Sequence, residues 1–433
     1  MVHQTMNTNT NAAALASTKI THIYTAPMFS IRTLRTSLLV SAAFVALSLA
    51  GCRTIEPEKV PVQPVKPVAP ITPVTPTQPA APAVTLRPSV FSAVPGWERD
   101  NLREAWQPFL SSCIVLVKKP EWKEPCTLAH DVDVRDDKAV RDFFEAFLQP
   151  YQVINADGTE QGMVTGYYEP LLRGARKRGG PYQTPLYRTP DDLLIVDLSS
   201  VYPDLKTMRL RGKLVGNKVV PYGSRGELMQ SGALNGKELL WVDDSIEAFF
   251  LQVQGSGRVQ LTDTKEMVRV AYADQNGYPY KSIGRYLVDK GEMTLDQASA
   301  QSIKAWAAAH PDREQELLNA NPSYVFFKEE KVNDPSIGPK GSLGVALTPQ
   351  RSIAVDNQFI PPGVPVFLAT SQPSSDVDLQ RLMLAQDTGG AIRGAVRADF
   401  FWGFGSEAQE KAGKMKQRGA MWVLLPKSVP PAN

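Results

Sequence analysis

The sequence predicts a mainly β protein with some α-helix, in which the strands form a closed barrel. Short apolar runs with Pro and Gly corners fill residues 151–222 and recur in residues 344–426. Amphipathic helical patterns lie before and between these regions, at 97–150 and 281–310. Many short strands separated by turn residues are typical of a barrel, whereas a parallel βαβ sheet alternates each strand with a helix.

The composition is that of a globular protein of ordinary charge. The chain has 433 residues, of which 43% are hydrophobic and 21% charged, and its formal net charge is +3. This length is enough for two or three domains with a large buried core. Because a near-neutral charge leaves no basic footprint, we expect no nucleic-acid partner.

Residues 1–51 have the pattern of a signal peptide. Two arginines precede an apolar run from Leu38 to Ala50, and this run of about 13 residues is shorter than the roughly 20 that a spanning helix needs. A short buried helix fits poorly, because a Pro-rich stretch follows it. Met28 is an alternative start, since residues 28–51 alone make an ordinary signal.

The end of this segment, Leu49-Ala50-Gly51-Cys52, resembles the lipobox of bacterial lipoproteins. The resemblance implies cleavage before Cys52 and lipidation of that residue, and two or more acyl chains anchor a protein stably. Arg53 follows, rather than the aspartate typical of inner-membrane retention. We therefore expect an outer-membrane lipoprotein that faces the periplasm.

Residues 52–96 form a predicted linker behind the lipidated cysteine. Within it, residues 61–82 carry proline at about every third position, which matches the three residues per turn of polyproline II and gives a stiff rod of roughly 65 Å. The alternative is a flexible disordered linker. Either reading makes the segment a spacer between the membrane and the folded body.

The folded part is expected to start near Trp97. The pattern predicts a helix over 97–113 and a second helix opening at Asp136. A helical section follows at 281–310, with Asp296 as its expected N-cap. Strands are predicted in these runs: 151–154, 162–170, 184–188, 192–198, 218–222, 246–261, 266–278 and the short runs of the last third.

The cysteines and histidines bear on redox and metal chemistry. Cys113 and Cys126 remain after Cys52, and in an exported protein they form either a short-loop disulfide or two buried free thiols. His130 and His310 have no neighbouring cluster of ligand residues. We therefore expect no metal site and no cofactor.

Three aspartates of the last third, Asp356, Asp387 and Asp399, are candidates for chemistry because they sit at the ends of predicted strands. Capping of turns is the alternative for each. Asp387 precedes a Thr-Gly-Gly turn whose N–H groups should hold its pKa down. The apolar neighbours of Asp399 should raise its pKa by desolvation. This contrast predicts Asp399 as a proton donor and Asp387 as its charged neighbour.

Two short motifs invite other readings. Asp387-Thr388-Gly389 matches the aspartic-protease signature, but a single chain needs two such turns and has only this one. The "QGSGR" stretch at 254–258 has a lone G-x-G without the Lys-Ser of a phosphate loop, so a bulge between two strands is preferred.

Several longer stretches together resemble the membrane-bound lytic murein transglycosylase A family. They include "VTGYYEP", "FFLQVQGSGRVQL", "NGYPYKSIGRYL" and "AQDTGGAIRGAVRADFFWGFGSEA". The match runs from about Trp97 to Pro426, and its last segment resembles the three-aspartate domain. The resemblance implies a double-psi β-barrel built from segments 97–165 and 326–428, a second β-domain inserted at 166–325, and a sugar-binding groove between them.

The resemblance also implies the reaction, which is carried out by a carbon–oxygen lyase. The β-1,4 bond between N-acetylmuramic acid and N-acetylglucosamine is cleaved without water, leaving a 1,6-anhydromuramoyl end. The general acid and base falls on Asp399, and its companions fall on Asp387 and Asp356. Tyr167, Tyr168 and Trp402 are predicted to pack against sugar faces, each with the alternative of a core role. Gln254 and Arg258 are predicted polar contacts of the glycan.

Two other functions stay open at this point. The chain could be a non-catalytic lipoprotein that binds the cell wall on the same fold, or a two-carboxylate murein hydrolase that uses water. Expected partners are peptidoglycan glycan strands, the membrane through Cys52, and complexes that synthesise the cell wall.

Overall fold

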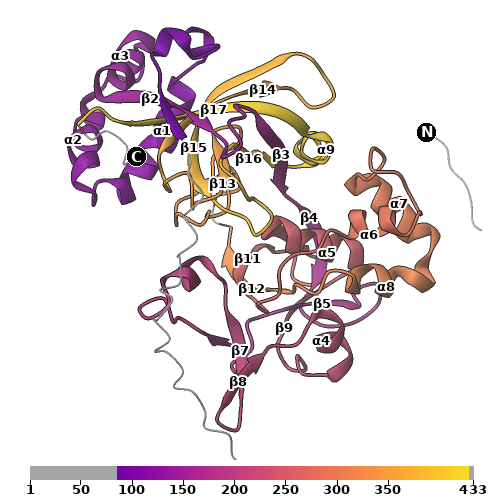
Figure 1. Ribbon diagram of the computed structural model, residues 1–433. Coiled ribbons are helices and arrows are strands. Elements are labelled where there is room, and N and C mark those ends of the chain that lie inside the picture. Colours follow the sequence, from indigo (N-terminus) through magenta and orange to yellow (C-terminus); the bar gives the residue numbers. More distant parts are fainter. Residues whose placement is uncertain (1–84, 333, 429–433) are drawn as a thin grey trace, which may run out of the picture. The chain divides into compact units, whose positions relative to one another are not determined.

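The computed structural model describes residues 85–332 and 334–428 (Figure 1). The predicted signal peptide, Cys52 and most of the linker lie outside the described residues. The residues described all belong to one compact unit, residues 78–433.

The largest sheet closes into a barrel. Its order is β1-β2-β17-β14-β15-β13-β16-β3, and β17 pairs with β3 as well as with β14, so six of these strands form a ring. In Figure 1 the early strands β2 and β3 lie beside the late strands β16 and β17. The strands are β1 (Thr85–Pro88), β2 (Leu148–Ile154), β3 (Gly162–Glu169), β13 (Ser352–Val355), β14 (Pro365–Ser371), β15 (Asp378–Asp387), β16 (Arg397–Phe404) and β17 (Lys416–Pro426).

This architecture confirms the prediction of a mainly β fold with some helix, and of a closed barrel. The ring is mixed, since β13 pairs parallel with β15 and β16 pairs parallel with β3. The double-psi crossover implied by the family resemblance stays a prediction.

Helices α1 (Arg103–Leu116), α2 (Pro120–Leu128) and α3 (Asp137–Phe147) pack on the barrel and share its main hydrophobic core. The carboxylate of Asp136 accepts a hydrogen bond from the backbone N–H of Lys138 at 2.8 Å, which confirms it as an N-cap. The buried guanidinium of Arg351 holds Asp100 through two hydrogen bonds of 2.9 Å and so fastens the start of this helical layer to the barrel.

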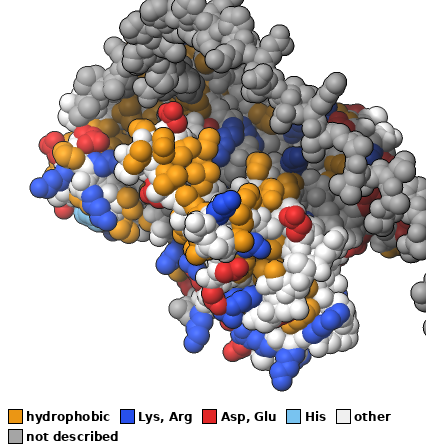
Figure 2. Space-filling view, turned by 60° about the horizontal axis from the view of Figure 1, so that its bottom comes forward, with side chains coloured by type: hydrophobic (Ala, Val, Ile, Leu, Met, Phe, Trp, Pro, Cys, Tyr) orange, Lys and Arg blue, Asp and Glu red, His pale blue; other side chains and the backbone are white. Residues whose placement is uncertain are grey.

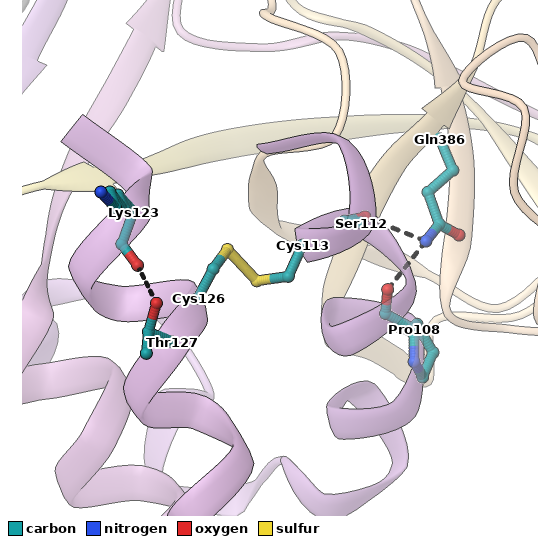
Figure 3. Close-up of a disulfide and its surroundings, with 7 residues drawn as sticks. All are labelled: Pro108, Ser112, Cys113, Lys123, Cys126, Thr127 and Gln386. Atoms are coloured by element: carbon teal, nitrogen blue, oxygen red, sulfur yellow. Dashed lines mark hydrogen bonds between the residues drawn. A yellow bond between two sulfur atoms is a disulfide. The ribbon is translucent and has the colours of Figure 1, made fainter. Parts of the chain in front are cut away.

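Helices α1 and α2 are joined by a Cys113–Cys126 disulfide, which decides between the two alternatives for these cysteines (Figure 3). In the same view, the amide of Gln386 on β15 donates hydrogen bonds to Pro108 O at 2.9 Å and to Ser112 Oγ at 3.0 Å. Both contacts tie α1 to the strand that carries Asp387.

A second sheet lies in the chain between β3 and β13, with order β12-β11-β10-β4-β9-β5. Its strands are β4 (Leu171–Ala175), β5 (Thr184–Tyr187), β9 (Glu238–Val242), β10 (Ser256–Leu261), β11 (Met267–Gln275) and β12 (Val325–Lys331). The remaining helices are α4 (Arg225–Ser231), α5 (Ser245–Gln254), α6 (Ile283–Asp289), α7 (Ala300–Ala309), α8 (Glu314–Asn319) and, beside the barrel, α9 (Ser406–Lys414). The domain limits given above stay a prediction, although β3 continues in the barrel to Glu169 and β12 belongs to the second sheet.

Several local predictions are wrong. The helix predicted over 97–113 begins only at Arg103, after a single 3-10 turn at Trp97–Arg99. The run 246–261 was expected to be all strand, but it forms helix α5 and strand β10. The helix begins because Asp244 accepts hydrogen bonds from two backbone N–H groups, and it ends at Gly255, whose φ is 82°. "QGSGR" is therefore a helix end followed by a strand, not a bulge between strands.

Asp296 is likewise not an N-cap. Helix α6 begins after Ser282 and helix α7 after Ser299, whose hydroxyl accepts a hydrogen bond from Ser302 N–H at 3.1 Å. A serine cap satisfies the same orphan N–H groups as an aspartate cap, so the pattern of apolar residues alone did not distinguish them.

A small third sheet has the order β6-β7-β8, with β6 (Leu194–Ile195), β7 (Arg211–Val215) and β8 (Lys218–Pro221). Its exposed side chains include Ile195, Leu214 and Val219. On the face shown in Figure 2, hydrophobic side chains lie among lysines, arginines and carboxylates. Within the described ranges, no helix combines the length and the apolar character needed to traverse a bilayer.

Replacing both bridged cysteines by alanine should lower the free energy of unfolding by about 2–4 kcal/mol, because the bridge closes a short loop and restricts the unfolded chain. Urea unfolding in the presence and absence of a thiol reductant measures this. The reductant should destabilise the natural protein by a similar amount and leave the double variant unchanged. Equal stability of all four samples would contradict a structural role for the bridge.

Candidate active site

Strand β13 brings Asp387 and Asp399 to neighbouring positions. Ala354 on β13 is in register with Asp387 on the parallel strand β15 and with Asp399 on the antiparallel strand β16. Residues in register on neighbouring strands point to the same face of a sheet, and neighbouring strands are about 4.8 Å apart. The two carboxyl groups therefore flank one small residue on one face of the barrel wall.

The carboxyl group of Asp399 is partly buried and accepts a hydrogen bond from Thr165 Oγ1 at 2.6 Å. Thr165 lies on β3, in register with Asp399. Burial raises the pKa of Asp399 above its ordinary value, the hydrogen bond and the charge of Arg397 act against this rise, and the charge of Asp387 adds to it. The predicted direction of the pKa shift is confirmed.

The apolar surroundings of Asp399 come from one side of β16 only. Phe401 lies two residues further along the strand and packs with Tyr167, their ring centroids 5.1 Å apart. These two rings belong to a small buried cluster with Leu347, Ala354 and Ile392. Phe400 and Trp402 alternate to the opposite side and belong to the main core. Desolvation of Asp399 thus depends on the small cluster rather than on the whole aromatic run.

Asp387 is held by three donors. Its Oδ1 accepts hydrogen bonds from the backbone N–H groups of Ser342 and Thr388, both at 2.9 Å, and its Oδ2 accepts one from Tyr167 Oη at 3.1 Å. We expected the N–H groups of the turn at 388–390 to hold its pKa down, and Thr388 is the donor from that turn. The expectation is wrong in its net direction, because burial raises the pKa of Asp387 by more than the donors lower it.

Arg397 is a site residue that sequence reasoning missed. Its Nη2 donates to Thr165 Oγ1 at 2.8 Å, so a cation, a hydroxyl and the Asp399 carboxyl form a chain of hydrogen bonds. Burial lowers the pKa of Arg397, and the charge of Asp399 opposes that shift. The sequence could have identified Arg397, because residues 397 and 399 alternate along a strand and their side chains therefore share a face.

Asp356 is 2% exposed, and its carboxylate binds the loop between the other two aspartates. Its Oδ2 accepts a hydrogen bond from Gly394 N–H at 2.9 Å, its Oδ1 accepts one from Gln358 N–H at 3.2 Å, and Arg393 Nη1 lies 3.7 Å from Oδ1. A buried carboxylate with donors on both oxygens fixes the path of the chain before β16.

The predicted glycan contacts are dispersed. Tyr168 and Trp402 are buried in the main core, and Trp402 Nε1 donates to Met415 Sδ. Gln254 is partly buried, and its amide oxygen accepts from Tyr168 N–H at 3.0 Å. Arg258 is buried in an ion pair with Glu169. The contact of these residues with a sugar stays a prediction.

The arrangement suits proton transfer. A carboxyl whose pKa is raised by burial retains its proton at higher pH than an exposed one. After it has donated this proton, the same carboxyl can accept another. The hydroxyl of Thr165 and the charge of Arg397 are placed to stabilise the ionised form that results. Among the residues that the structure describes, no group of three or more His, Cys, Asp and Glu is placed to hold a metal ion.

Comparison with known proteins covers both parts of the fold. Residues 163–328 match the MltA specific insert domain, and residues 351–425 match the 3D domain. The chain is 35% identical over 286 residues to membrane-bound lytic murein transglycosylase A of Escherichia coli, an alignment that covers 64% of this chain and 69% of that protein.

Two solved structures match most of this chain. The lytic transglycosylase LtgG of Burkholderia pseudomallei is 47% identical with a TM-score of 0.54, and the match covers 80% of this chain and 98% of that one. MltA of Escherichia coli with bound chitohexaose is 28% identical with a TM-score of 0.57, and the match covers 74% of this chain and 90% of that one.

Replacing Thr165 by valine should raise the pKa of Asp399 further, because the hydroxyl stabilises the ionised carboxyl. Titration of 13C-labelled aspartate carboxyls by NMR, with the Asp399 signal assigned from its loss in Asp399→Asn, measures this. Thr370→Val is the matched control, since its hydroxyl donates instead to Arg418 O. An Asp399 that titrates at or below 3.8 in the natural protein would overturn the account of the site.

Proposed function

This chain belongs to the membrane-bound lytic murein transglycosylase A family, and we propose that it cleaves peptidoglycan glycan strands with Asp399 as its single general acid and base. The supporting observation is the partly buried carboxyl of Asp399 with its raised pKa and its hydrogen bond from Thr165. The substrate bond is the β-1,4 linkage from N-acetylmuramic acid to N-acetylglucosamine. The related Escherichia coli enzyme with chitohexaose bound supports binding of a β-linked glycan.

In the proposed reaction, Asp399 first gives its proton to the glycosidic oxygen as the bond from C1 to that oxygen breaks. The ionised carboxyl then accepts the proton of the C6 hydroxyl, whose oxygen forms the new bond to C1. Because this closure is intramolecular, a high effective molarity replaces an activated water. The product carries a 1,6-anhydro ring, and Asp399 regains its proton.

Asp387 has an electrostatic role in this proposal. An ionised carboxylate accepts hydrogen bonds and does not donate them, and Asp387 accepts three. Negative charge beside C1 stabilises an oxocarbenium-like transition state. The same charge raises the pKa of Asp399, which favours the protonated form that must start the reaction. Asp356 acts one step further away, by holding the loop that enters β16.

Replacing Asp399 by asparagine should reduce the cleavage rate by at least roughly 10²–10⁴-fold, the range for loss of one general acid–base group. Release of soluble muropeptides from purified murein measures the rate, and mass spectrometry identifies the ends. Asp387→Asn should reduce the rate by less. Asp378→Asn, at the exposed far end of β15, is the matched control and should keep full activity.

The products also separate the three functions. Anhydro ends support the transglycosylase, and reducing ends would indicate a two-carboxylate hydrolase that uses water. Retention of murein without any cleavage would indicate a binding lipoprotein. Full activity of Asp399→Asn would remove this residue from the mechanism.

The related protein in Escherichia coli is named membrane-bound. For this chain we propose lipidation at Cys52, attachment to the outer membrane with the folded body in the periplasm, and a place in complexes that synthesise the cell wall. Cys52 is the only cysteine that precedes the Pro-rich linker, and small residues occupy the two positions before it.

Cys52→Ala should therefore move the protein from the membrane fraction to the soluble periplasmic fraction while its activity on purified murein stays unchanged. Cell fractionation with immunoblotting measures the distribution. Retention of the variant on membranes that have been washed with high salt would contradict a lipid anchor at this position.

A further inference from the structure

One face of strand β3 carries three polar side chains at alternate positions: Thr165, Tyr167 and Glu169. Thr165 donates to Asp399 at 2.6 Å, and Tyr167 donates to Asp387 at 3.1 Å. Glu169, the third, has a fully buried side chain and faces the second sheet instead. Since residues that alternate along a strand share a face, the three contacts depend on one placement of β3.

Glu169 is held by two arginines of the second sheet. Its Oε2 accepts from Arg258 Nε on β10 at 2.9 Å, and its Oε1 accepts from Arg269 Nε on β11 at 2.5 Å. Arg258 and Arg269 are directly opposite one another in the β10–β11 pair. Two buried cations at opposed positions repel, so the carboxylate between them is required for the pair to stay buried.

The three residues also contact two other segments, the connection from β12 to β13 and the end of β16. Arg269 Nη2 donates to Ile337 O at 2.7 Å, on the path from β12 to β13. The ring of Phe404, at the end of β16, lies 4.1 Å from the guanidinium carbon of Arg258. Phe404 is in register with Glu169 across the β16–β3 pair. One carboxylate thus joins β3, β10, β11 and, through Arg258, the strand that carries Asp399.

Arg258 depends closely on this carboxylate. Its Nη2 is buried and has no hydrogen-bond partner among the described residues, while its Nε donates to Glu169 and its guanidinium lies over the Phe404 ring. A second, partly buried ion pair of the insert, Arg211 with Asp274 at 2.8 Å, has no hydrogen bond or ion pair to β3 among the described residues. The insert therefore offers a matched pair that differs in its connection to the site.

We propose that Glu169, Arg258 and Arg269 form a positioning cluster. Through this cluster, the position of the inserted sheet relative to β3 determines two hydrogen bonds at the site. These are the bond from Thr165 to Asp399 and the bond from Tyr167 to Asp387. The cluster sets the placement of β3 along β16. Displacement of the insert would pass to the two carboxyl groups through a single strand. This inference rests on the proposed role of Asp399, and Glu169 does not itself touch the reacting atoms.

The first test is titration of the Asp399 carboxyl by NMR in Glu169→Gln. Loss of the anchoring charge should lengthen the Thr165–Asp399 hydrogen bond, and the pKa of Asp399 should rise toward that of Thr165→Val. The groups that face Asp399 are Arg397, Asp387 and Tyr167, and none is altered in the variant. The double variant with Thr165→Val should show no further rise, because both changes act on one hydrogen bond.

Kinetics provide the second measurement. Glu169→Gln should lower kcat by up to about 10²-fold, the scale expected for misplacement by around 1 Å, with a smaller change in KM. The alkaline limb of the profile of kcat against pH should move to higher pH, because an Asp399 with a raised pKa stays protonated up to a higher pH. Arg211→Gln should lower the melting temperature without moving that limb.

Phe404→Leu keeps the experiment decisive if Glu169→Gln does not fold, because Phe404 is 41% exposed and its loss leaves every charge in place. It should shift the Asp399 titration in the same direction by less. An unchanged titration in folded Glu169→Gln, or failing that in Phe404→Leu, would show that the cluster is structural only. Since the NMR readout needs no turnover, this outcome is distinct from a failure of the murein assay.

Discussion

Parallel pairing of β3 with β16 is the constraint on which the site depends. It joins residues 234 positions apart, placing Thr165 beside Asp399 and Tyr167 within reach of Asp387. Everything between the two strands in the chain, including the second sheet, must fold so that this pairing can form. Parallel strands need a long crossover, and here the whole insert lies within that crossover. The site and the domain insertion are therefore consequences of one pairing.

The site is energetically unfavourable in one respect, because burial destabilises the ionised forms of two carboxyl groups. Burial raises the pKa of both Asp387 and Asp399, so each would lose a proton less readily than an exposed aspartate. The protein assigns them different surroundings. Asp387 receives two backbone N–H groups and a tyrosine hydroxyl, whereas Asp399 receives one threonine hydroxyl and has Arg397 nearby. More donors favour the ionised form, so the two carboxyl groups on either side of β13 differ in how strongly their charged forms are stabilised.

The barrel and the insert each hold one of the strands that carry the site. The main core joins α1 to α3 to the barrel, the Arg351–Asp100 pair fastens the start of this helical layer, and Gln386 ties α1 to the strand of Asp387. The second sheet has its own core and meets β3 at a buried carboxylate. A chain that cleaves a polymer must admit a long glycan while it keeps its acid fixed within a fraction of an ångström. The buried contacts of Gln386 and Glu169 hold the two strands on which Asp387 and Thr165 lie.

The sequence by itself determined the class of fold, the closed barrel, the start of a helix at Asp136 and the upward direction of the pKa shift at Asp399. These follow from local pattern, since strand length, turn residues and apolar neighbours are visible along the chain. Only the tertiary structure decided the roles of Arg397, Thr165 and Glu169, because their partners lie on strands far away in sequence. It also reversed the expected shift at Asp387, where burial raises the pKa by more than the hydrogen bonds from Ser342, Thr388 and Tyr167 lower it. Desolvation depends on the surroundings in space, and the neighbours of a residue along the chain supply only part of them.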